Sequence, residues 1–169
     1  MRVLLGIVAL LILAALGMAV WIYAGGYDAS ATARDPKAVE WITETARRQS
    51  VRVHARDIPV PQLADPILVE EGARTFAAHC TQCHAAPGMA PPRIAAAMQP
   101  SPPDLAQEVA EWTTPELFWI VRNGFKMTGM PAWGQILVDG EIWGVVAFLE
   151  QMPSMAPERY QQLVSPPPP

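Results

Sequence analysis

The sequence predicts an all-α protein in which one N-terminal membrane-spanning helix precedes a small helical domain. Two observations lead to this fold class. Residues 3–24 contain no charged side chain, and three later segments, 66–79, 115–123 and 141–151, have helical character, with apolar residues at helical spacing in the last two. No strand-rich segment lies between these later helices.

Size and composition restrict the kind of protein this can be. The chain has 169 residues and only two cysteines, so a disulfide network is excluded. Its net charge of −4 argues against a nucleic-acid partner, because such proteins usually present a basic surface. About 100 residues remain for a folded domain, and a core of that small size benefits from a large bound cofactor.

The apolar N-terminus is long enough to cross a membrane. Residues 3–24 would form a helix of about 33 Å, and the hydrocarbon core of a bilayer is about 30 Å thick. Trp21 and Tyr23 lie at one end, where aromatic rings favour the interface. The flanking positive charges, Arg2 and the N-terminus, precede the segment. We therefore expect residues 1–25 to be a single-pass anchor in the cytoplasmic membrane, with the rest of the chain on the periplasmic side.

A cleaved signal peptide is the alternative for this segment. Ala29-Ser30-Ala31 has the form of a cleavage site, but the apolar run is longer than the 7–15 residues or so of a signal peptide. The retained anchor is therefore favoured. Either alternative delivers the remaining chain to the same compartment.

Residues 26–63 are predicted to be a linker that contains one short helix. Asp35-Pro36 is typical of a helix start, and the apolar pattern after it predicts an amphipathic helix over 36–48. Residues 51–58 begin with alternating apolar and polar side chains, which predicts an extended stretch.

Two features of this linker allow more than one interpretation. Arg47-Arg48 could contact lipid headgroups, but an interaction with the dipole at the end of the predicted helix is favoured. His54 could bind a metal, although a lone histidine in a linker is more often an ordinary polar side chain.

The strongest motif in the chain is Cys80-Thr81-Gln82-Cys83-His84. This C-x-x-C-H pattern is the attachment signature of c-type haem. Two thiols on one helical turn can reach both vinyl groups of the porphyrin, and the next residue then places its imidazole beneath the iron. The sequence therefore predicts one covalent haem c, attached at Cys80 and Cys83, with His84 as an axial ligand of the iron.

The other uses of a C-x-x-C pair fit less well. A thioredoxin-like redox pair requires a βαβ setting, whereas residues 66–79 before the motif are predicted to be helical. A zinc site requires two further ligands, and His54, His79 and His84 are the only histidines.

The residues around this motif resemble the class I cytochrome c family over about residues 64–152. Asp65-Pro66 caps a first helix, and Gly72 and Phe76 lie eight and four residues before Cys80. The resemblance implies a cytochrome c-like haem domain of three to five helices over residues 64–155, in which Gly72 lets the first helix cross the last one closely. Phe148 is then expected to pack on Phe76.

Two further helices complete the expected domain. The last one, 141–151, has an apolar face, and the one at 115–123 begins with a capping-box spacing between Thr113 and Glu116 and stops at Gly124. Their predicted core residues are Leu117, Phe118, Ile120, Val121, Ile142, Val145, Val146 and Leu149. Residues 156–169 are predicted to be a proline-rich tail.

The resemblance also implies a second axial ligand on the loop before the last helix. Gly129-Met130-Pro131 matches the family's pattern for a methionine ligand, which assigns Met130 to the iron. Met127 is the alternative methionine, and an open or histidine-ligated iron is also considered. Thioether ligation raises the reduction potential relative to two histidines.

Three details around the haem remain open at this point. A proline carbonyl in segment 86–92 is expected to accept the Nδ1–H of His84. His79 is expected to face solvent or the propionates. Trp112 and Trp133 could each bond a propionate or be a buried aromatic.

These features predict an electron carrier and not an enzyme, because a six-coordinate iron has no position for a substrate. The chain resembles bacterial membrane-anchored cytochromes related to the haem subunits of oxidases and dehydrogenases. We expect membrane or periplasmic redox proteins as partners, lipid contact through the N-terminal helix, and neither nucleic acid nor a small-molecule substrate. The alternatives are a haem c subunit of a larger oxidoreductase complex or a peroxidase-type enzyme, which is disfavoured because no histidine or carboxylate lies beside Met130.

Overall fold

The computed structural model describes residues 1–165, and all regular secondary structure in this range is helical. The predicted all-α fold class is thereby confirmed. The range separates into one unit of Met1–Arg34 and a second unit that begins at Asp35. Residues 166–169, the end of the predicted tail 156–169, lie outside the described range.

The first unit contains one long apolar helix, α1, from Arg2 to Tyr23. It has 22 residues, a mean hydropathy of 2.9 over its most apolar window, and no buried side chain. By length and composition this helix could cross a membrane, as the sequence predicted.

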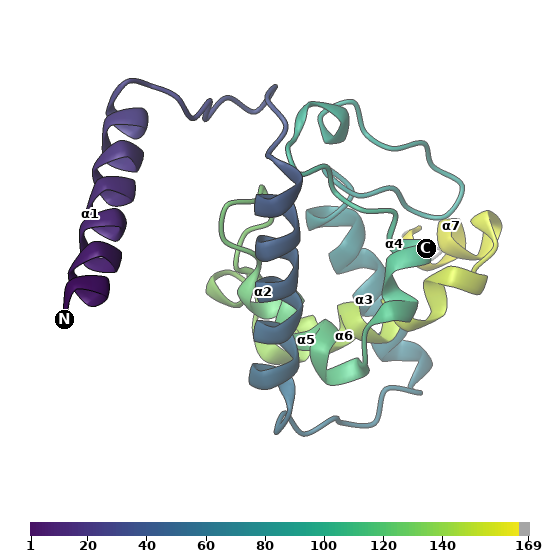
Figure 1. The fold of residues 1–169 in the computed structure, drawn as a ribbon. Helices are drawn as coiled ribbons and strands as arrows, with labels where there is room; N and C mark the ends of the chain where they lie inside the picture. The colour runs from purple at the N-terminus through teal and green to yellow at the C-terminus, as the bar shows by residue number, and fades with distance from the viewer. Residues whose placement is uncertain (166–169) are drawn as a thin grey trace. The chain divides into compact units, whose positions relative to one another are not determined.

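The second unit is organised around two helices that cross at glycines. These are α3 (Pro66–His79) and α6 (Asp139–Gln151), seen in Figure 1 at the centre of the unit. A Cβ atom added to Gly72 would lie 1.8 Å from the carbonyl oxygen of Gly144, so only glycine permits this approach. The rings of Phe76 and Phe148 lie 5.1 Å apart between their centroids, which confirms the predicted helix crossing.

Helix α5 (Thr114–Asn123) packs on α6 and completes the predicted three-helix framework. The predicted pairing of Thr113 with Glu116 forms, because the backbone N–H of Thr113 donates to the Glu116 carboxylate at 2.8 Å. Helix α5 ends at Gly124, whose φ of +61° favours glycine. All eight predicted core residues of α5 and α6 are buried, so the apolar periodicity identified the correct faces.

Helix α2 (Lys37–Ala55) is longer than the sequence predicted, and the expected extended stretch at 51–58 is wrong. The reason is burial at helical spacing. Val51 and Ala55 lie four residues apart, and both are fully buried where α2 packs along α5 (Figure 1). Much of the predicted linker 26–63 therefore belongs to the compact unit.

A further helix, α7 (Pro157–Val164), lies within the predicted proline-rich tail. Its Tyr160 and Leu163 are buried, and the helix packs against α3. Proline at the first helical position starts α7 instead of preventing a helix. Short elements fill the connections: η1 (Ala95–Ala97), α4 (Leu105–Glu108), η2 (Val109–Glu111), η3 (Trp133–Gln135) and η4 (Met152–Ser154).

Candidate functional site

The C-x-x-C-H motif lies on the turn that follows α3. The backbone N–H of Cys80 donates to the carbonyl of Phe76 at 2.8 Å and thereby continues the hydrogen bonding of α3. The N–H groups of Cys83 and His84 then both donate to the carbonyl of Cys80, at 3.0 and 2.9 Å. One tight turn therefore carries both thiols and the imidazole, as the sequence predicted.

The Cys80 thiol lies in an environment that does not favour the thiolate. Burial, together with the neighbouring Cys83, raises the pKa of the Cys80 thiol to about 12. Reactive cysteines have a lowered pKa, because the thiolate is the nucleophile and the metal ligand. Within residues 1–165 no group of three histidine, cysteine or acidic side chains is placed to hold a metal ion.

The imidazole of His84 is oriented by a backbone carbonyl. Its Nδ1–H donates to the carbonyl oxygen of Pro103 at 3.2 Å, so the acceptor is not in the predicted segment 86–92. Asp104 caps α4 next to this proline, and its side chain accepts from the N–H of Ala106 at 3.1 Å. Burial lowers the pKa of His84, which favours the neutral ring, and the bond at Nδ1 leaves the Nε2 lone pair for a metal.

The two methionines that compete as second ligand lie in different environments. Met130 is half-buried and packs against the hydrophobic core. Met127 is 88% exposed, and its backbone has a φ of +60°, a left-handed conformation that is typical of turns. The core therefore receives Met130 and not Met127.

The loop that carries Met130 is closed by its own hydrogen bonds. The hydroxyl of Thr128 donates to the carbonyl of Phe125 at 2.8 Å and accepts from the N–H of Met130 at 3.1 Å. A Cβ atom on Gly124 would lie 2.5 Å from the carbonyl oxygen of Pro131, so glycine is required where the two ends of the loop meet.

One methionine that the sequence gave no reason to select lies against this loop. A Cβ atom on Gly129 would lie 1.8 Å from the terminal methyl of Met98, which is half-buried. No sequence motif marks Met98, because it comes from the segment after the haem-attachment turn and reaches the loop only in the folded chain.

The tryptophans and histidines considered for the haem site have protein partners. Trp133 is buried and its ring lies 5.3 Å from that of His79, which is half-buried. Trp112 donates its indole N–H to Glu108 at 3.3 Å. The ring of His54 stacks on that of Trp119 in α5, with 5.7 Å between the ring centres. This contact agrees with the interpretation of His54 as an ordinary side chain.

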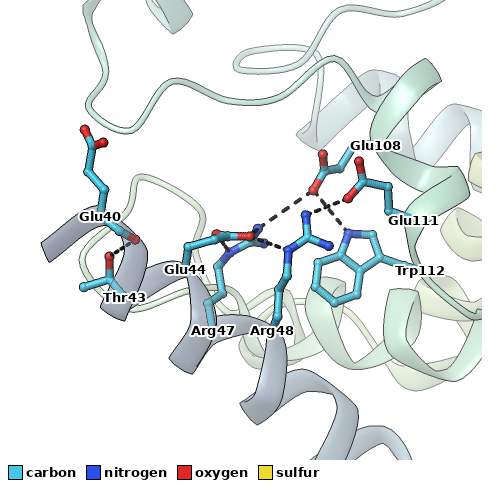
Figure 2. A network of polar contacts seen from close by, with 8 residues as sticks. All are labelled: Glu40, Thr43, Glu44, Arg47, Arg48, Glu108, Glu111 and Trp112. Atoms are coloured by element: carbon cyan, nitrogen blue, oxygen red, sulfur yellow. Dashed lines mark hydrogen bonds and ion pairs between the residues drawn. The ribbon is translucent and has the colours of Figure 1, made fainter. Parts of the chain in front are cut away.

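Helix α2 adds a polar network that sequence analysis missed (Figure 2). Arg47 and Arg48 extend from α2 toward η2, and their guanidinium carbons lie 5.4 and 5.2 Å from the ring centre of Trp112. Arg48 also pairs with Glu111 at 2.6 Å. The predicted role of these arginines at a helix C-terminus is wrong, because α2 continues to Ala55.

A comparison with known families agrees with this site. The family described as cytochrome c oxidase, cbb3-type, subunit III matches residues 68–149, which include the attachment turn and the Met130 loop. No curated protein matches the chain. Two thiols on one turn, an oriented imidazole and a half-buried thioether are the groups that would hold a c-type haem, so the residues present fit this cofactor. Residues 68–149 therefore form a class I c-type cytochrome domain, whose cofactor is covalently bound haem c.

Proposed function

We propose that the chain carries single electrons through one haem attached at Cys80 and Cys83 and coordinated axially by His84 and Met130. Bound haem iron supplies one-electron redox chemistry. The carbonyl of Pro103 holds the His84 ring in the tautomer that could bind the iron, and the thioether of Met130 would supply the second ligand. With both positions filled by the protein, outer-sphere electron transfer is the expected activity, and substrate chemistry is not.

The placement of the loop methionines carries this proposal. Met130 packs against the core, whereas Met127, three residues earlier, is 88% exposed. A thioether that packs against the core and an imidazole oriented through its Nδ1 are the two protein ligands that a six-coordinate haem iron would require. Met98, which touches Gly129, is the second methionine that the experiment has to exclude.

The proposed location is the periplasmic face of the cytoplasmic membrane. Helix α1 could span the bilayer, and the positive charges of Arg2 and the N-terminus precede it. Because such charges favour the cytoplasmic side, the cytochrome domain is expected on the opposite side. Periplasmic or membrane-bound redox proteins of respiratory or dehydrogenase systems are the expected partners.

A second candidate function is that of a permanent haem c subunit in a larger oxidase complex. The match to a family named after subunit III of a cbb3-type oxidase favours it. Extraction of the membranes with a mild detergent, followed by size-exclusion chromatography with haem detection, separates the two functions. A carrier elutes near the size of its own chain in detergent, whereas a subunit elutes with its complex.

The ligand assignment is tested by replacing each methionine in the full-length holoprotein. Ferric haem shows a weak far-red absorption band when a thioether sulfur is bound. We expect Met130→Ala to abolish this band and to lower the reduction potential, because a thioether ligand favours ferrous iron. The matched variants Met127→Ala and Met98→Ala should retain both properties. A band that survives in Met130→Ala would contradict the proposal.

A further inference from the structure

The side chain of Arg47 on helix α2 contacts the ligand loop. The carbon atom at the centre of its guanidinium group lies 4.9 Å from the ring centre of Phe125 and 5.4 Å from that of Trp112. Cations in this position are attracted to the faces of aromatic rings. Arg47 lies outside the family match of residues 68–149, so this contact is additional to the matched domain.

The guanidinium group of Arg47 is held in place by acidic side chains. Its Nε and Nη2 atoms donate to the two carboxylate oxygens of Glu44, both at 2.7 Å, which fixes the plane of the group. Its Nη2 atom also lies 3.9 Å from a carboxylate oxygen of Glu108, and Figure 2 shows these groups around Arg47. Arg47 is half-buried and therefore presents a rigid cationic surface to Phe125.

Phe125 is in turn connected to Met130. The backbone N–H of Phe125 donates to the carbonyl of Met130 at 3.4 Å. The hydroxyl of Thr128 joins the same two residues, since it donates to the carbonyl of Phe125 and accepts from the N–H of Met130. A displacement of Phe125 therefore changes the position of the Met130 backbone at two hydrogen bonds.

We propose that Arg47 is a positioning residue for Met130, which it holds against the iron by fixing Phe125. This inference rests on the proposed function, because it requires Met130 to be an axial ligand. Opening of the loop frees the iron position that Met130 occupies. Loss of Arg47 is expected to increase the open fraction of the loop while leaving the attachment turn unchanged.

Competition with added imidazole measures the open fraction. Imidazole can bind the ferric iron only where Met130 has left, so its apparent dissociation constant is inversely proportional to the open fraction. In the full-length holoprotein in detergent, we expect Arg47→Ala to bind imidazole about tenfold more tightly than wild type. Imidazole binding is measured by the loss of the far-red band as imidazole is added. Arg47→Lys keeps a cation but not the planar group, so an intermediate affinity is expected.

Arg48 supplies a matched control on the same helix. It shares Glu44 and Trp112 with Arg47, and only Arg47 has a cation–aromatic contact with Phe125. Arg48→Ala should therefore bind imidazole like wild type. Phe125→Leu should reproduce the effect of Arg47→Ala, and the double variant should add little to either change, because both remove the same contact.

The results separate this inference from the function on which it rests. If the wild-type band survives in Met130→Ala, the ligand assignment fails and the inference fails with it. If the band depends on Met130 but Arg47→Ala binds imidazole like wild type, or Arg48→Ala tightens binding equally, the positioning role alone is overturned. Should Arg47→Ala not fold, Phe125→Leu and Arg47→Lys apply the same test.

Discussion

The two sides of the haem site are built in different ways. The His84 side consists of five consecutive residues on one turn, which continues the hydrogen bonding of α3. The Met130 side is an irregular loop whose ends meet at Gly124 and which is contacted by Met98 and by Arg47 from α2. The attachment turn of the first side is determined by local sequence, with Pro103 as its one distant partner in the contacts described above, whereas the second side is determined mainly by contacts between distant segments. Changes far from the motif should therefore affect Met130 ligation before they affect haem attachment.

The largest expected effect comes from removing the attachment side. The double variant Cys80→Ser/Cys83→Ser should lose all covalent haem, because the chain has no other thiols. Haem staining after denaturing electrophoresis measures this loss. Met130→Ala should keep its stain in full, since it changes only a coordinate bond. If Met130→Ala lost its haem stain as completely as the double cysteine variant, the distinction between the attachment side and the Met130 side would be contradicted.

The helix crossing that supports the attachment turn should be the next most sensitive feature. Gly72→Ala places a Cβ atom 1.8 Å from the carbonyl oxygen of Gly144. We expect the free energy of unfolding to fall by about 1–3 kcal/mol or more, as for other overpacked positions. Gly140→Ala is the matched control on α6, because a Cβ atom there meets nothing within 4 Å. Denaturant unfolding of both holoproteins tests this, and equal stability would contradict the close crossing.

Weakening the attachment of α2 should act on the Met130 side. Val51 is fully buried on α2, whereas Val53 on the same helix is 55% exposed. Val51→Ala should lower the free energy of unfolding by about 0.5–3 kcal/mol, the usual range for a core truncation. It should also tighten imidazole binding, and Val53→Ala should change neither quantity. An unchanged imidazole affinity in Val51→Ala would separate α2 from the ligand loop.

The smallest expected effect concerns acid pH. Hydrogen bonds from Arg47, and then from Arg48, hold the pKa of Glu44 below its ordinary value near 4.5, although burial opposes them. Because the folded-state pKa is lowered, the contribution of Glu44 to stability is present above the ordinary pKa and is lost as the pH falls through the folded value.

Comparison with Glu44→Gln measures this contribution. Wild type should be slightly more stable than Glu44→Gln to denaturant at neutral pH, and the difference should disappear in acid. The effect is small because the Glu44 side chain is 43% exposed and therefore screened by solvent. A difference that grew as the pH fell would have the wrong sign for this network.

The sequence predicted those parts of the fold that depend on neighbouring residues. The cap at Asp65, the capping box at Thr113 and the turn at Cys80 each involve groups within a few positions of one another. Gly72 was also identified, through the family resemblance and its fixed distance from the attachment motif. The bounds of α3 agree with the prediction for the same reason, since both of its ends are locally encoded.

The parts that could not be predicted depend on residues distant in sequence. Pro103 accepts from His84 across 19 positions, and prolines between them were equally plausible acceptors. Alternation at 51–58 predicted an extended stretch, but burial of Val51 and Ala55 against α5 favours a helix. Nothing in the local pattern relates Arg47 to Phe125, because that contact joins residues 78 positions apart.

The central claim, that Met130 is bound to the iron, is tested most directly by NMR of the ferrous full-length protein with labelled methionine methyl groups. A methyl group directly over the porphyrin plane experiences a strong ring-current shift. We predict that one of the eight methionine methyl resonances is shifted far upfield, that Met130→Leu removes it and that Met127→Leu retains it. An upfield resonance that persists in Met130→Leu, or its absence from wild type, would contradict the account.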